Sequence, residues 1–341
     1  MNTIDLVQMN LSSPMVLAFV LGVGATLLKS DLRLPETVYT FLSIYLLFAI
    51  GLKGGFALAQ TELAALWLPV LATLGLGMVI PVWCYALLRW LGSFGVADAA
   101  ALAAHFGSVS AVTFSAGLTF LDELNVAYEG FMPTLMALME IPAIAVALII
   151  AHYRLAAQKV ILPAPGQESE QSASNHQSAV SWQHALHEVL TGKSIVLLAG
   201  GLLIGWVAGE PGYQQIAPFF LDLFPGMLTL FLLELGVTAG RWLRDLRQVG
   251  VFLVGFSTIM PVLHGALGIW LGYWSGLSLG GSMLLGLLAA SASYIAAPAA
   301  VRIALPQANP CYYLTAAIAL AFPFNLTVGL PLYFMLAQML Y

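Results

Sequence analysis

Two short segments rich in hydroxyl side chains interrupt otherwise apolar stretches of this chain. The first reads Gly107-Ser-Val-Ser-Ala-Val-Thr-Phe-Ser115, and the second reads Ser291-Ala-Ser-Tyr-Ile-Ala-Ala-Pro298. Both are weak helix formers compared with the Leu-rich sequence around them. Pro298 in addition removes a helical hydrogen bond and disfavours helical geometry in the residue before it. We therefore predict a break in the helix at each segment.

Two such breaks would offer ligands for charges of both signs. The N-terminal ends of half-helices carry free N–H groups and the positive end of the helix dipole, which suit a small anion. Unwound carbonyls and Ser or Thr hydroxyls provide the oxygen ligands that a hard cation such as sodium prefers. The competing interpretation is that these small residues only allow helices to pack closely in a membrane.

Few ionisable residues lie inside the apolar stretches, and the main ones are Glu140, Glu234, His105 and His264. An ionisable residue at membrane depth is a functional-site hypothesis by default. Glu140 is the strongest candidate because Pro142 frees a backbone carbonyl near it. A buried hydrogen-bonding role for Glu140 stays equally open, and a structural role is favoured for His264.

The composition explains why charge is so scarce. Of the 341 residues, 60% are apolar and only 8% are charged, whereas an ordinary soluble domain carries about 25% charged residues. This excludes a soluble enzyme, and the net charge of −5 disfavours nucleic-acid binding. No catalytic, cofactor or metal motif is present, so we expect no enzyme activity and no cofactor other than a coupling ion.

The apolar residues divide into ten segments of membrane-spanning length, which predicts an all-α polytopic membrane protein. The ten predicted spans are 14–29, 36–56, 64–91, 97–122, 129–153, 193–209, 218–240, 248–274, 280–304 and 310–340.

The basic residues predict the orientation of these spans. With both termini outside, every Lys and Arg except Lys53 falls on the cytoplasmic side, as the positive-inside rule requires. The polar stretch 155–192 is then a cytoplasmic linker between a first half at 1–154 and a second half at 193–341. The expected location is the plasma (inner) membrane, in contact with its lipid.

The two halves also resemble each other in sequence. Four pairs of positions recur in the same order, with offsets between 180 and 185 residues. The pairs are Gly51 with Gly236, Pro81 with Pro261, Ser108 with Ser291, and Pro142 with Pro323. Because five spans is an odd number, the repeat must be inverted across the membrane. Inverted 5+5 repeats with broken, crossing helices are typical of secondary transporters, whose sites lie near the midplane.

Several motifs resemble one known family. IGLKGGFAL, FGSVSAVTFSAGLTFLDE, YEGFMPTLMALMEIPA, PVLHGALG, PQANPCYYLTAA and GLPLYFMLAQ occur in this order, and they are similar to the cyanobacterial sodium-dependent bicarbonate transporters (SbtA). The resemblance covers nearly the whole chain and is poorest in the linker. It implies a homotrimer of subunits with core and gate domains, sodium/bicarbonate symport, and a PII-like signalling protein that binds the cytoplasmic face.

The resemblance also implies which residues meet the substrate and the coupling ion. Those expected to bind bicarbonate are Gly107, Ser108, Ser110, Ser291 and Ser293. Tyr294 is added to this set because its phenol can donate a hydrogen bond to an anion. Those expected to bind sodium are Ser108, Ser110, Thr113, Glu140 and Ser293.

One departure from the family affects the predicted coupling. The second break of the family resembles S-S-S-D-I-S-G-P-P, and this chain carries Tyr294 in place of the aspartate. A carboxylate is a strong sodium ligand, whereas a phenol can donate a hydrogen bond to an anion. Two alternatives to sodium-coupled bicarbonate import therefore stay open. One is a carrier of another small carboxylate or anion with altered or absent sodium coupling, and the other is a non-transporting membrane sensor for a PII-like regulator.

Overall fold

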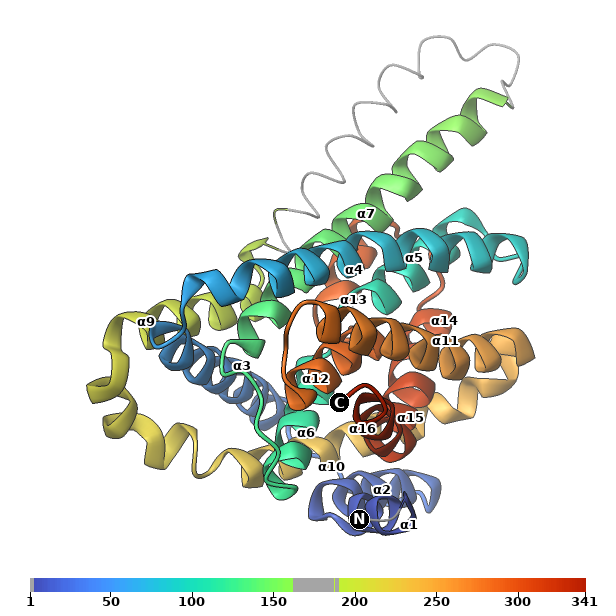
Figure 1. The fold of residues 1–341 in the computed structure, drawn as a ribbon. Coiled ribbons are helices and arrows are strands. Elements are labelled where there is room, and N and C mark those ends of the chain that lie inside the picture. The colour runs from blue at the N-terminus through green and yellow to red at the C-terminus, as the bar shows by residue number, and fades with distance from the viewer. Residues whose placement is uncertain (1–2, 162–186, 188–189) are drawn as a thin grey trace.

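The computed structural model describes residues 3–161, 187 and 190–341, and all regular elements in this part of the chain are helices (Figure 1). The predicted all-α class is therefore confirmed. The linker predicted at 155–192 lies mostly outside the described residues. Its first residues continue helix α7, which runs to Ile161.

The helices follow the apolar segments in order. In the first half they are α1 (Thr3–Ser12), α2 (Pro14–Leu27), α3 (Glu36–Ala59), α4 (Leu63–Trp90), α5 (Val96–Gly107), α6 (Ala111–Glu123) and α7 (Met132–Ile161). In the second half they are α9 (Lys193–Phe220), α10 (Phe224–Trp242), α11 (Leu246–Trp274), α12 (Leu279–Ala290) and α13 (Ala296–Ala304). The last segment runs from Pro310 to Gln338 as α14 (Pro310–Leu314), α15 (Phe322–Phe324) and α16 (Leu330–Gln338), joined by π-helical turns at Thr315–Ala321 and Asn325–Gly329.

Seven segments of the described chain are long and apolar enough to cross a membrane, or eight if α1 and α2 form one bent span. This number is below ten partly because Phe224–Trp274 counts as one segment of 51 residues, although it contains both α10 and α11. In addition, α12 has only 12 residues and does not reach spanning length alone. The ten-span arrangement thus stays a prediction.

Two glycines kink helices close to predicted span ends. Gly209 adopts φ 55° inside α9, where predicted span six ends. Gly250 adopts φ 76° inside α11, near the predicted start of span eight. Positive φ is readily available to glycine and strained for other residues, so the sequence itself specifies both bends.

Both predicted helix breaks are present. The first lies at 108–110, between α5 and α6, and the second lies at 291–295, between α12 and α13. Ser110 and Ser291 adopt extended backbone conformations. Each apolar segment is therefore divided into two half-helices.

Glycines allow two pairs of helices to pack backbone against backbone. A Cβ atom added to Gly55 of α3 would lie 2.2 Å from the Leu202 carbonyl oxygen of α9. A Cβ atom added to Gly236 of α10 would lie 2.1 Å from the Phe19 carbonyl oxygen of α2. Small residues at helix interfaces permit this approach in membranes. Gly55 thus lies at the α3–α9 interface and Gly236 at the α2–α10 interface.

We predict that Gly55→Ala destabilises the protein by about 1–3 kcal/mol, because the added methyl group overpacks the α3–α9 interface. Thermal unfolding in detergent measures the effect. Gly200→Ala in α9 is the matched control, since a Cβ atom there meets nothing within 4 Å. Equal melting temperatures for the two variants would contradict the close packing of α3 and α9.

Candidate binding site at two helix breaks

The two helix breaks lie against each other and satisfy each other's backbone groups. The Ser110 N–H donates to Ser291 Oγ at 2.9 Å, and the Ser293 N–H donates to the His105 carbonyl oxygen at 2.8 Å. The Ser291 hydroxyl in turn donates to the Leu288 carbonyl oxygen at 2.8 Å. The two breaks therefore form one hydrogen-bonded crossing, although they are far apart in the sequence.

A serine from each break caps the half-helix that follows it. Ser110 Oγ accepts from the Thr113 N–H at 3.1 Å and from the Thr113 hydroxyl at 2.9 Å. Ser293 Oγ accepts from the Ala297 N–H at 3.2 Å. The N-terminal ends of α6 and α13 thus both begin at the crossing, where their dipoles favour negative charge.

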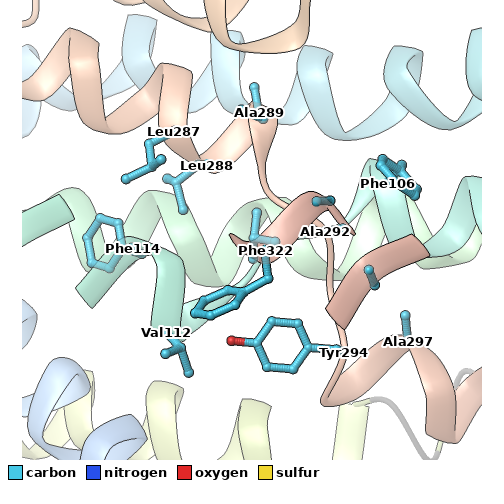
Figure 2. Packing of buried hydrophobic residues seen from close by; sticks show 14 of the residues in the cluster. Phe106, Val112, Phe114, Leu287, Leu288, Ala289, Ala292, Tyr294, Ala297 and Phe322 are labelled. Atoms are coloured by element: carbon cyan, nitrogen blue, oxygen red, sulfur yellow. The ribbon is translucent and has the colours of Figure 1, made fainter. Parts of the chain in front are cut away.

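Two polar groups at the crossing lack a partner within the described chain. Ser108 Oγ and the Tyr294 hydroxyl are buried and have no partner in the described chain with good hydrogen-bond geometry, although the Tyr294 hydroxyl lies close to the Ser110 side chain. A buried polar group without a partner costs about 1–3 kcal/mol, so each is a candidate contact for a ligand or water. Figure 2 shows the Tyr294 ring between α13 and Phe322, with its oxygen directed towards the start of α6 near Val112. The Phe322 ring packs edge-on against the Tyr294 ring, with 5.6 Å between the two ring centroids.

A narrow cavity lies beside the crossing, and its volume of about 10 Å³ leaves room for about one water molecule. Its polar lining residues are Ser110, Glu140, Ser194 and Tyr294. Its other lining residues are Leu47, Val109, Ala111, Met136, Leu198 and Ile295. The cavity therefore combines both breaks with α3, α7 and α9.

Glu140 brings a carboxylate into this cavity. The residue is 7% exposed, and no Lys, Arg or His nitrogen of the described chain lies within 4.0 Å of its carboxylate. A buried carboxylate without a cationic partner is costly. Such a carboxylate is neutralised either by a proton or by a bound cation.

The predicted site residues consequently separate into two groups. Ser110, Tyr294 and Glu140 line one cavity. The remaining predicted residues lie at the crossing but outside the cavity lining; they are Gly107, Ser108, Thr113, Ser291 and Ser293. Gly107 has a packing role as well, since a Cβ atom there would lie 2.5 Å from Pro81 Cγ.

The other ionisable candidates have local partners. Glu234 accepts from the Leu34 N–H at 2.6 Å and lines a different cavity. His264 accepts from Trp83 Nε1 at 2.8 Å, which joins α11 to α4. His105 Nδ1 lies 2.7 Å from the Ala101 carbonyl oxygen, whereas its Nε2 is buried without a partner in the described chain.

Two polar residues of this region were not predicted from the sequence. Ser194 at the start of α9 lines the cavity. Asn325 holds the end of α12, because its side-chain amide donates to the Ala290 carbonyl oxygen at 2.9 Å and accepts from the Tyr333 hydroxyl at 2.8 Å. An isolated asparagine in an apolar run was the available signal for Asn325. Ser194 directly follows the polar linker and carried no such signal.

We predict that Ser291→Ala lowers the free energy of unfolding by about 1–3 kcal/mol, because the buried Ser110 N–H then loses its acceptor. Ser108→Ala is the matched control, since its hydroxyl has no partner to lose within the described chain. Thermal unfolding of both purified variants checks the difference. A Ser108 variant that is destabilised as much as the Ser291 variant would show that the crossing is bonded differently.

Comparison with known proteins places the chain in a family. No curated protein matches the chain. The family description that does match is the Na⁺-dependent bicarbonate transporter superfamily, over residues 14–338. This match includes both breaks, Glu140 and the linker between the halves. With apolar helices of spanning length and nearly its whole length matched, the chain is a membrane protein that belongs to the Na⁺-dependent bicarbonate transporter superfamily.

Proposed function

We propose that this protein imports bicarbonate by sodium symport and that both ions bind at the crossing of the two broken helices. One observation carries the proposal: a carboxylate without a cationic partner in the described chain, Glu140, shares a cavity with the Tyr294 phenol and with Ser110. Membership of the family supports the same pair of ions.

The anion would bind on the side of the breaks. Tyr294 supplies a hydroxyl donor that is not otherwise used in the described chain, and α6 supplies the positive end of its dipole. None of the cavity's lining residues in the described chain is Lys or Arg. Binding by dipoles and hydroxyls, without a full positive charge, lets a monovalent anion enter and leave readily.

The cation would bind between Glu140 and the unwound segment. A hard cation prefers carboxylate, hydroxyl and carbonyl oxygens, and Glu140 lines the cavity beside Ser110. Since residue 294 is a tyrosine here, the carboxylate comes from α7 instead of from the second break. The chain thus retains an acidic sodium ligand, although the break itself contains none.

Electrostatics would couple the two ions. At a separation of about 5 Å and an effective dielectric constant of about 20, two like unit charges repel by about 3 kcal/mol. An anion entering beside an ionised Glu140 meets this repulsion unless a cation has first neutralised the carboxylate. Sodium binding would therefore precede bicarbonate binding.

Proton coupling would not serve the same purpose. A proton and a bicarbonate ion together are equivalent to carbon dioxide and water. Carbon dioxide crosses lipid bilayers freely, so proton symport would accumulate nothing that diffusion does not equilibrate. Coupling to a metal cation such as sodium avoids this loss, because sodium and bicarbonate do not combine into a species that diffuses across the bilayer.

The predicted topology is part of the proposal. Ten spans form an inverted 5+5 repeat with both termini outside and the linker in the cytoplasm. The glycine contacts support this arrangement, because α3 packs on α9 as α10 packs on α2. In an inverted repeat, the pair of spans two and six corresponds to the pair of spans seven and one. On the resemblance alone, three copies assemble and a PII-like protein binds the cytoplasmic face.

A carrier of another small carboxylate is the second candidate function, favoured by Tyr294. A phenol donor recognises any carboxylate-like anion, and bicarbonate is the smallest of this class that also carries a hydroxyl group. Competition by formate and acetate against labelled bicarbonate uptake separates the two functions, since a general carboxylate carrier would be inhibited by both.

We predict that Glu140→Gln abolishes the sodium dependence of bicarbonate uptake, because the neutral amide no longer attracts the cation. Uptake of labelled bicarbonate into proteoliposomes, with sodium or potassium outside, measures this dependence. Glu234→Gln is the control, since Glu234 lies in another cavity. If the unmodified protein shows no uptake with either sodium or potassium, the transport proposal is refuted. If its uptake does not depend on sodium, only the coupling is refuted.

Tyr294 allows a test of the anion contact. Tyr294→Phe keeps the ring against Phe322 and removes the donor, so we expect the KM for bicarbonate to rise about 10- to 150-fold, as for a lost hydrogen bond to a charged group. Tyr294→Asp should make uptake more strongly dependent on sodium, because it adds a second carboxylate. An unchanged KM in Tyr294→Phe would remove the phenol from the anion site.

A further inference from the structure

A second cavity lies at the other end of α6, with a volume of about 470 Å³. Its ionisable and polar lining residues are Lys53, Thr119, Asp122, Glu123 and Tyr213. Apolar residues of α3, α6 and the α9–α10 junction complete its wall, among them Ile50, Leu118 and Phe224. The proposed orientation puts this cavity on the outer side of the membrane.

The second cavity follows the crossing cavity along the same two helices. Helix α3 contributes Leu47 to the crossing cavity and Lys53 to the outer one. Helix α6 contributes Ala111 to the first and Asp122 to the second. At 1.5 Å per residue, these pairs are about 9 Å and about 16 Å apart along their helices. The outer cavity is thus positioned as an entrance to the crossing.

Lys53 is the one basic residue that the topology leaves on the outer side. Its ammonium donates to the Tyr128 hydroxyl at 2.8 Å, and that hydroxyl donates to Asp122 Oδ1 at 2.9 Å. The direct distance from Lys53 Nζ to Asp122 Oδ2 is 3.8 Å. The ammonium therefore has a neutral phenol as its near partner and a carboxylate only at the long limit of an ion pair.

The environment keeps this phenol neutral and leaves the ammonium accessible. Burial, and then the Asp122 carboxylate, raise the pKa of Tyr128, which lies in the loop between α6 and α7. The side chains of Lys53 and Asp122 are 39% and 54% exposed. An exposed ion pair is worth at most about 1 kcal/mol, so an incoming anion can compete with Asp122 for the lysine.

We propose that this outer cavity is a second site for the transported anion, with the Lys53 ammonium as its ligand and with Tyr128 and Asp122 holding that ammonium until the anion arrives. The inference rests on the proposed function, since it assumes that an anion passes along α3 and α6 to the crossing. The anion that binds in this outer cavity is a small monovalent oxyanion. The carboxylates of Asp122 and Glu123 disfavour divalent anions at the same place and keep binding weak enough for the anion to move on.

Two charge-neutralising variants test the role of Lys53 in uptake. Lys53→Gln should raise the KM for bicarbonate about tenfold with little change in the maximal rate, as expected for the loss of one charge-assisted hydrogen bond. Asp122→Asn should lower the KM, because it removes the competitor for the ammonium. Lys53→Arg should stay close to the unmodified protein.

A purely structural tie between α3 and the α6–α7 loop predicts a different pattern. In that case Lys53→Gln and Asp122→Asn, which break the same contact from opposite sides, change uptake and thermal stability alike. Parallel effects of the two variants, or an unchanged KM in Lys53→Gln, would overturn the anion site.

A labelling experiment separates this inference from the proposed function. Thr119→Cys places a thiol in the outer cavity, in a background of Cys84→Ala and Cys311→Ala. Bicarbonate should slow the reaction of this thiol with a membrane-impermeant methanethiosulfonate, relative to chloride at equal ionic strength, and Lys53→Gln should remove the protection. Protection without any uptake would support the site and refute the transport function. Uptake without protection would refute the site alone.

Discussion

The structure depends on one constraint, which is that backbone polar groups inside a membrane must be satisfied within the protein. A helix meets this requirement internally, and a broken helix does not. Here two breaks meet it together: the Ser110 N–H bonds to the Ser291 hydroxyl, and the Ser293 N–H bonds to the His105 carbonyl. Without the other break, each break would leave a buried backbone N–H or carbonyl group without a partner. The crossing therefore fixes how α5, α6, α12 and α13 lie relative to one another.

The same constraint explains why the two halves of the crossing are chemically unequal. Ser108 and Ser291 occupy paired positions of the repeat, yet Ser291 is fully bonded whereas Ser108 has no partner in the described chain. At this pair of positions only the hydroxyl of the second half makes structural hydrogen bonds, and the corresponding Ser108 hydroxyl of the first half has no partner in the described chain. An exactly symmetric crossing would use both hydroxyls for structure and keep neither for a ligand.

Much of this could be predicted from the sequence, because the relevant signals are local. Hydroxyl-rich segments in apolar runs predicted the two breaks. Gly51 and Gly236 were recognised only as paired positions of a repeat, and their close helix contacts emerged from the structure. Which hydroxyls make structural hydrogen bonds and which have no partner could not be predicted, since this depends on contacts between residues about 180 positions apart. The proximity of Glu140 and Tyr294 was predicted only through the family resemblance, because spacing along the chain carries no information on which faces of α7 and the second break approach each other.

That meeting changes how the substitution at Tyr294 should be understood. With an aspartate at this position, the cavity would hold two carboxylates, that of the aspartate and that of Glu140. An incoming anion would then be repelled by both. With tyrosine it faces one carboxylate and gains a hydrogen-bond donor. If Glu140 holds the coupling cation, a single sodium ion neutralises the protein charge in the cavity before the anion binds. Under the proposed function, the substitution would leave the basis of coupling in place and would lower by one the number of cations that the cavity needs.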